Sequence, residues 1–145
     1  MTIHLDTSVL IDILTRERPL LAAYERSVTA GHRIGMSTIA LYEWLRGPRT
    51  DLDIRLQRDI CPADRIVTFG SIEAALAADL FREVKSRRGR EADIAIAACA
   101  IEHEAAVWTT NRRHFQDIPG LRLYAVASGA PSAFRAPPAL SPDSL

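Results

Sequence analysis

The sequence predicts an α/β fold, a three-layer α/β/α sandwich built on a mostly parallel central sheet. Short apolar segments typical of strands alternate along the chain with longer segments of helical periodicity. Residue types that favour helix N-caps follow directly after the first two apolar segments, at residues 6–8 and 37–38. In such a fold, functional groups gather beyond the carboxyl ends of the strands.

Strands are expected where short apolar runs are bounded by polar or turn-forming residues. The predicted strands are residues 3–5, 34–36, 65–69, 107–108 and 121–126. Helices fill most of the intervals between them, so that crossover connections would join mostly parallel strands.

Four helices are predicted in the first half of the chain. An apolar run (Val9 to Leu14) follows the N-cap types at residues 6–8, and Pro19 suits the start of a second helix that Gly31 ends. Ser37 or Thr38 caps a third helix, which Gly47-Pro48 ends. Its expected buried stripe is Leu41, Trp44 and Leu45. A fourth helix covers about 52–60, before Pro62.

Two longer helices are predicted in the second half. Gly70-Ser71 opens the first of them, which continues into the basic segment 85–90. Its expected apolar side is Ile72, Ala75, Leu76, Leu80 and Val84. Asp93 starts an alanine-rich helix over 94–103, whose small side chains permit close packing against a sheet, and residues 109–117 are expected to form a loop.

Composition and charge exclude several protein classes. The 145 residues suit one domain, and 18 basic residues against 18 acidic ones give no bulk attraction to nucleic acid. Cys61 and Cys99 have no partner spacing typical of a disulfide framework or a zinc site. The apolar run 94–101 is far too short for a membrane helix. We therefore expect a cytoplasmic protein with no membrane partner.

The domain is predicted to span residues 1–127. From residue 128 onward, prolines arrive together with Ser and Ala, and apolar periodicity is lost. We therefore expect a proline-rich, disordered tail over 128–145.

Three acidic residues stand where a parallel sheet would bring them together. Asp6 follows the first strand, Glu43 lies in the helix after the second, and Asp93 opens the helix before the strand at 107–108. Each also has a purely structural explanation, as a helix cap for the two aspartates and as a solvated charge for Glu43. If the three converge, their repulsion requires a divalent ion, and an all-oxygen ligand set favours Mg²⁺ or Mn²⁺.

Four stretches of the chain resemble the PIN domain and, within that family, the VapC-type toxins of bacterial toxin–antitoxin pairs. They read LDTSVLID at 5–12, STIALYEWLRG at 37–47, DIAIAA at 93–98 and TTNRRHF at 109–115. Their order and spacing agree with the family from residue 2 to about residue 126.

The resemblance implies a Mg²⁺-dependent ribonuclease with Asp6, Glu43 and Asp93 as its catalytic residues. Asp6 and Asp93 are the first choice as metal ligands, and Mn²⁺ is a possible substitute for Mg²⁺. The resemblance further implies a homodimer that cleaves RNA and is neutralised by a VapB-type antitoxin. Residues 10–24 and 41–56 are candidate surfaces for the dimer or the antitoxin.

The sequence departs from the family pattern at the usual fourth acidic position, where Asn111 stands. An amide oxygen can bind a metal or orient a water, but it brings no charge. Glu91 and Asp117 are possible substitutes, with solvated roles as the alternative for both. Ser8 and Thr110 are expected to support the site with their hydroxyls, or else to serve only as local helix and loop hydrogen bonders.

Arginines flank the three acidic positions and are candidates for contact with the RNA phosphates. The predicted contacts are Arg46, Arg88, Arg112 and Arg113. A solvated face is the alternative for this set. We do not expect His114 to act as a general base, because metal-assisted hydrolysis makes that role unnecessary, and packing or phosphate contact is the expected role.

Two other functions compete with the ribonuclease. Haloacid-dehalogenase-like phosphatases also place an aspartate after the first strand, but they need a second aspartate where this chain has Ser8 and a late lysine, whereas the one lysine here is Lys85. A catalytically weakened PIN scaffold that binds protein or RNA is the second alternative, since a fold does not guarantee its chemistry.

Overall fold

The computed structural model describes residues 1–15 and 20–126 of the chain. The predicted helix start at Pro19 and the predicted tail at 128–145 lie outside these residues. Within them the strands β1 (Thr2–Leu5), β2 (Arg33–Ser37), β3 (Ile66–Val67) and β4 (Ala105–Trp108) form one sheet in the order β3-β2-β1-β4. The three pairings in this described sheet are parallel, which confirms the predicted α/β class.

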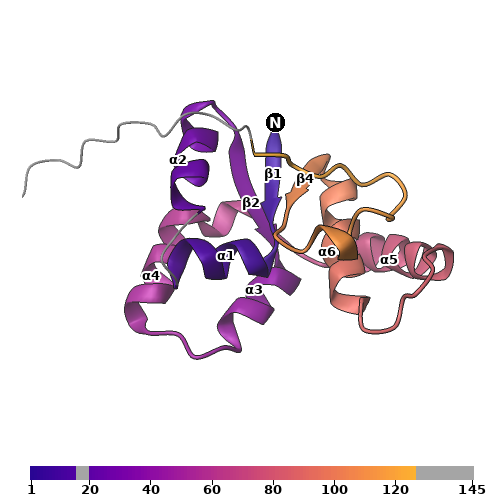
Figure 1. Cartoon of the computed structure of the whole chain (residues 1–145). Coiled ribbons are helices and arrows are strands. Elements are labelled where there is room, and N and C mark those ends of the chain that lie inside the picture. The colour runs from indigo at the N-terminus through magenta and orange to yellow at the C-terminus, as the bar shows by residue number, and fades with distance from the viewer. Residues whose placement is uncertain (16–19, 127–145) are drawn as a thin grey trace, which may run out of the picture.

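Six α-helices connect and cover the described strands. They are α1 (Thr7–Leu14), α2 (Leu21–Thr29), α3 (Thr38–Leu45), α4 (Asp51–Ile60), α5 (Ser71–Glu83) and α6 (Glu91–Glu102). Figure 1 shows α1, α2 and α4 on one side of the sheet and α5 and α6 on the other. Helix α3 lies beyond the carboxyl end of the sheet, where it contacts both α1 and α6.

Side-chain caps determine where several helices begin. The Asp6 carboxylate accepts from the backbone N–H of Thr7 at the start of α1, and Ser37 Oγ accepts from the N–H of Ala40 at the start of α3. Thr50 and Asp53 form a capping box that starts α4. Satisfying the first N–H groups of a helix in this way stabilises it by about 1 kcal/mol per cap.

The core lies where the sheet meets α1 and α6. Ile3 and Leu5 of β1 are completely buried, as is Trp44 of α3. Seven consecutive residues of α6, from Ile94 to Ala100, are also buried, and four of them are alanines. These small side chains allow α6 to pack closely against the sheet, as the sequence analysis predicts.

Several local predictions are wrong. Leu121–Val126 is not a strand of the sheet: it pairs with β4 through a single bridge, between Val107 and Leu123. The strand predicted at 65–69 is present but shorter: β3 covers only Ile66–Val67 and follows a 3₁₀ turn (Ala63–Arg65). Helix α6 begins at Glu91, two residues before Asp93, so that Asp93 lies in its first turn and does not open it.

The buried faces of two helices also differ from the predicted stripes. Leu45 of α3 and Ile72 of α5 are 46% and 66% exposed, and Ala75 is exposed too. Leu80 of α5 and Val84, which directly follows the helix, are buried as predicted. No helix in residues 1–15 and 20–126 is long and apolar enough to span a bilayer, and Cys61 and Cys99 are buried free thiols.

Candidate functional site

The candidate site lies where β1, β2 and β4 end and α1, α3 and α6 begin. Asp6 directly follows β1, and its backbone N–H donates to the carbonyl of Trp108, the last residue of β4, at 2.9 Å. This bond joins the ends of two neighbouring parallel strands. It therefore places Asp6 beside Thr109, although 103 positions separate them in the sequence.

Asp6 is buried and both of its carboxylate oxygens are engaged. Oδ1 accepts from the Thr7 N–H at 2.8 Å, which is the helix-cap bond. Oδ2 accepts from the hydroxyls of Ser8 and Thr109, each at 2.8 Å. The structural explanation of Asp6 as a cap is thus correct, but a cap uses one oxygen, and the second oxygen is held in place by two further residues.

Glu43 lies on α3 with a side chain that is only 20% exposed. Its Oε1 accepts from the Thr7 hydroxyl at 3.1 Å, and Arg46 Nη2 lies 3.6 Å from Oε2. Burial raises the pKa of Glu43, and the negative charges of Asp6 and Asp93 raise it further, against the opposing effects of the Thr7 bond and of Arg46. Glu43 is therefore not the solvated surface charge of the alternative explanation.

Asp93 contacts the loop that follows β4. His114 Nδ1 lies 2.9 Å from Asp93 Oδ2. Burial raises the pKa of Asp93, and the charge of Asp6 adds to this increase, while the His114 bond and the charge of Arg90 oppose it. Asp93 is thus a partly buried carboxylate facing the site.

Asp6, Glu43 and Asp93 therefore lie close enough for each of the other two charges to affect the pKa of Glu43. Their oxygens are hard donors of the kind that bind Mg²⁺ or Mn²⁺, and a cation would relieve the repulsion. The three carboxylates therefore suit a divalent ion by their chemistry and charge. Across residues 1–15 and 20–126, however, no three His, Cys, Asp or Glu side chains converge closely enough to hold a metal ion as they stand.

The loop after β4 brings some of the predicted residues together. The Thr110 N–H donates to Ser8 Oγ at 3.1 Å, while Thr110 itself is exposed. The Asn111 N–H donates to Thr109 Oγ1 at 2.9 Å, and its side-chain amide lies 3.1 Å from His114 Nδ1. The loop side chain in contact with Asp93 is therefore His114, with Asn111 behind it.

The two possible substitutes for a fourth carboxylate lie elsewhere. Asp117 forms an ion pair with Arg90, and hydrogen bonds from this guanidinium lower the pKa of Asp117. Glu91 is exposed in the first turn of α6. Within the described part of the chain, neither of them forms a hydrogen bond or ion pair with Asp6, Glu43 or Asp93.

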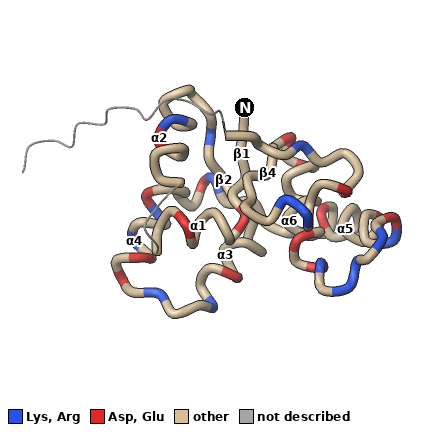
Figure 2. Tube along the Cα trace, in the orientation of Figure 1, with Lys and Arg blue, Asp and Glu red and all other residues tan. Residues whose placement is uncertain are grey.

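Basic residues surround the start of α6. Figure 2 shows them in the loop between α5 and α6 and in the turn after β4. The four predicted phosphate contacts, Arg46, Arg88, Arg112 and Arg113, are all exposed. Arg46 also lies beside Glu43 and over the ring of Tyr42, 5.5 Å from its centroid.

Sequence reasoning missed three contributors to the site. Thr7 links Asp6 to Glu43, Thr109 holds Asp6, and Arg90 binds the loop that carries His114. The available signal for Thr109 was its position directly after β4, which is equivalent to the position of Asp6 after β1.

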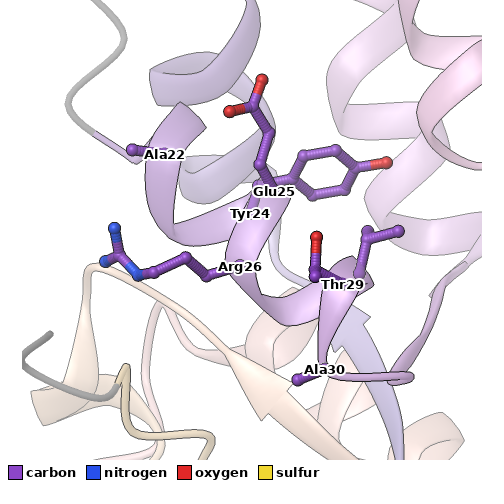
Figure 3. A pocket seen from close by; sticks show the side chains of 7 residues that line it. Ala22, Tyr24, Glu25, Arg26, Thr29 and Ala30 are labelled. Carbon is purple, nitrogen blue, oxygen red and sulfur yellow. The ribbon is translucent and has the colours of Figure 1, made fainter. Parts of the chain in front are cut away.

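A pocket of about 520 Å³ lies along α2, away from the three carboxylates. It is lined entirely by residues of α2 and the residue that follows, and Figure 3 shows that the side chains of Glu25 and Arg26 point in different directions. Because its polar groups do not converge, we place the candidate site at the carboxylates and not in this pocket.

Comparisons with solved structures bear on the fold. VapBC2 from Rickettsia felis bound to promoter DNA aligns with a TM-score of 0.66 and 18% identity, over 86% of this chain and 98% of the other. The values for DNA-bound VapBC from Salmonella typhimurium are 0.65 and 20%, over 86% and 97%. For FitAcB from Neisseria gonorrhoeae they are 0.63 and 22%, over 86% and 97%.

No curated protein sequence matches the chain. The solved structures share its fold at low sequence identity, as the values above state. A family model of the PIN domain, in contrast, matches residues 3–121. This match covers far more than half of the 145 residues, and it includes Asp6, Glu43 and Asp93. The chain therefore belongs to the PIN domain family.

Proposed function

We propose that this PIN domain is a divalent-metal-dependent ribonuclease, the toxin of a toxin–antitoxin pair. The observation that carries the proposal is the proximity of the three carboxylates: Thr7 bonds to both Asp6 and Glu43, and burial together with the charge of Asp6 raises the pKa of both Glu43 and Asp93. Placing three ionised carboxylates near one another with little exposure to water destabilises the fold, and a bound cation would offset this destabilisation.

Asp6, Glu43 and Asp93 would hold the ion. Mg²⁺ or Mn²⁺, when bound, supplies a Lewis acid and lowers the pKa of water for attack on a phosphodiester. The residues of this chain orient the ligands: Ser8 and Thr109 fix Asp6, Thr7 fixes Glu43, and His114 contacts Asp93. The exposed arginines around the site attract the RNA backbone and offset the charge of the carboxylates.

The proposed partner is suggested by the solved structures of similar fold. The structures of similar fold are VapBC and FitAB complexes, several of them bound to DNA. By analogy, we propose a VapB-like antitoxin as the partner that silences this chain. The fold alone does not define this partner, so co-purification with a small protein from the source cell is the test.

We also propose that the chain forms a homodimer through α3 and α4. Tyr42, Leu45 and Leu52 are each at least 46% exposed, within the surface 41–56 that the sequence analysis assigns to a partner. Sedimentation equilibrium of the purified chain should give twice the mass of one chain. A monomer at micromolar concentration would exclude the dimer.

The ribonuclease is tested with purified protein free of any partner. Cleavage of RNA should require Mg²⁺ or Mn²⁺, stop in EDTA, and fall by about 100-fold or more in Asp6→Asn and Asp93→Asn, because loss of a group that merely supports a metal ligand already costs 10–100-fold. Asp79→Asn is the matched control, since Asp79 is an exposed carboxylate on α5 paired with Arg82. Cleavage that persists in EDTA would refute the proposal.

A binding module is the second candidate. Two observations favour it: Asn111 carries no charge at the expected fourth position, and the described carboxylates are not gathered around one point. This candidate predicts no cleavage of RNA with either metal ion, together with stable binding of RNA or of a protein partner.

A further inference from the structure

Arg90 ties three separate segments together at the start of α6. Its Nη1 donates to the carbonyl of Lys85 at 3.2 Å, and its Nη2 donates to the carbonyl of His114 at 2.7 Å. The two nitrogens also donate to the two carboxylate oxygens of Asp117, with 3.0 Å between Nη1 and Oδ2. Arg90 is only 8% exposed, whereas the side chain of Asp117 is 45% exposed, so the guanidinium is shielded from water on all sides but that of Asp117.

The Arg90–Asp117 pair fixes the loop after β4 against α6. His114 belongs to this loop, and Arg90 holds it directly through its backbone carbonyl. The ring of the same residue contacts Asp93. Arg90 is the N-cap residue of α6, and Asp93 lies three residues later in the same helix. Arg90 is therefore connected to both sides of the contact, to His114 through its guanidinium and to Asp93 through the helix backbone.

The contact between His114 and Asp93 has a defined chemistry. An ionised carboxylate only accepts hydrogen bonds, so the bond to Asp93 requires the proton of His114 on Nδ1, and this nitrogen then accepts nothing from Asn111 Nδ2, 3.1 Å away. This fixes the tautomer and the orientation of the ring, and it leaves one Asp93 oxygen engaged. A group that orients a metal-binding carboxylate in this way commonly affects both metal affinity and activity.

We propose that Arg90, together with Asp117, is a positioning residue that holds His114 on Asp93 and thereby orients this carboxylate in the site. Arginine is required at this place because a planar guanidinium reaches the Asp117 carboxylate and two backbone carbonyls at once. A lysine would supply the charge but not the fork. The part of this inference that concerns RNA cleavage rests on the proposed function, whereas the part that concerns the geometry does not.

Three variants test the inference. Arg90→Lys keeps the charge and removes the fork, and Asp117→Asn removes the carboxylate from a side chain that is 45% exposed, so that folding should survive. Asp117→Glu is the conservative variant, which keeps a carboxylate. Asp79→Asn, which breaks the exposed Asp79–Arg82 pair of α5, is the matched control.

The first readout is the ring ¹⁵N spectrum of the metal-free protein, with the His114 signals assigned by their loss in His114→Gln. Wild type, Asp117→Glu and Asp79→Asn should show a single Nδ1–H tautomer. Arg90→Lys and Asp117→Asn should show signals averaged between the two tautomers. Unchanged His114 signals in both of the last two variants would overturn the inference, whatever the protein does to RNA.

The second readout is RNA cleavage. In Arg90→Lys and Asp117→Asn, kcat should fall by about 10–100-fold with little change in KM, and Asp117→Glu should restore it. Full activity in variants whose His114 signals have changed would also overturn the inference. If wild type cleaves no RNA at all, the proposed function fails, and the spectra still decide the geometry.

Discussion

At the scale of single residues, hydroxyl groups determine how the carboxylates are held. Thr109 is 6% exposed, and its hydroxyl donates to Asp6 while it accepts from the N–H of Asn111. Thr110, the next residue, is exposed and reaches the site through its backbone N–H. The hydroxyl of Thr109 therefore helps to hold Asp6, whereas that of Thr110 does not.

Replacing Thr109 by Val keeps the shape of the side chain and removes both of these bonds. The free energy of unfolding should fall by roughly 1–3 kcal/mol, because the buried Asp6 carboxylate and the partly buried N–H of Asn111 each lose a partner. Thr110→Val is the matched control and should stay within about 0.5 kcal/mol of wild type. Urea unfolding measures both variants, and equal losses would contradict the assignment of Thr109.

His4 of β1 is a buried residue on the side of the sheet that α5 and α6 cover. It is 2% exposed, its Nδ1 has no partner among the described residues, and the ring of His103 lies 6.3 Å away between centroids. Glu73 of α5 pairs with His103 at 3.1 Å. Burial, with a smaller effect of His103, lowers the pKa of His4 to about 4.

This lowered pKa makes the fold sensitive to acid. The unfolded chain takes up a proton at His4 as the pH falls below about 6.5, whereas the folded chain resists protonation until about pH 4, so stability is highest above pH 6.5 and is lost between these values. From pH 7 to pH 5 the loss should be about 2 kcal/mol. Urea unfolding of His4→Leu should lack this loss, and His32→Leu should keep it. An equal loss in His4→Leu would contradict the account.

The sequence could predict that Asp6, Glu43 and Asp93 lie near one another, but not how they are held. Asp6 and Glu43 were identifiable because each follows a predicted strand by a short distance in a parallel sheet. The choice between Thr109 and Thr110 was not possible, because a shift of one residue in the loop reverses which hydroxyl points inward. His114 was likewise identifiable as polar and near the site, but its contact with Asp93 depends on how Arg90 binds the loop.

At the scale of elements, the contact between β2 and the turn before β3 depends on Gly35. A Cβ at Gly35 would lie 2.8 Å from the backbone carbonyl of Arg65 and 3.3 Å from the His4 ring. The carbonyl belongs to the 3₁₀ turn, so it cannot move away without shifting β3 along the edge of the sheet.

Gly35→Ala should therefore lower the free energy of unfolding by roughly 1–3 kcal/mol, as overpacking does in a tight contact. Gly47→Ala is the comparison, because its Cβ would meet the Arg49 guanidinium and not backbone, so that it should cost at most the Arg49 bond to the Trp44 carbonyl, about 1 kcal/mol. Thermal unfolding followed by circular dichroism compares the two. A Gly35→Ala protein as stable as wild type would show that β3 is loosely attached.

Elements with strong local signals were predictable, and marginal elements were not. The caps and breakers around α1, α3 and α4 determine those helices locally. The segment 121–126 has strand-like alternation, yet beyond the single bridge at Leu123 it is held largely by side chains, with Tyr124 packed on Trp108 at 5.4 Å and bonded to Ser27. In α5 the sheet and α6 select the buried face, and Ile72 falls outside it.

At the scale of the whole molecule, the alternation of strands and helices determines the architecture. Parallel strands end at one edge, and this edge brings Asp6 and Thr109 together, with Glu43 and Asp93 near them, from four distant parts of the sequence. The fold could therefore be predicted, along with the edge of the sheet at which these side chains meet. The proposed function depends on whether the carboxylates at this edge bind a cation.

Titration of the metal-free chain with Mn²⁺, followed by the electron paramagnetic resonance of the free ion, measures this directly. Wild type and Asp79→Asn should bind Mn²⁺ saturably, whereas Asp6→Asn and Asp93→Asn should bind it at least tenfold more weakly. Equal affinity in all four proteins, or no binding by wild type at millimolar Mn²⁺, would contradict the claim that these carboxylates form a cation site.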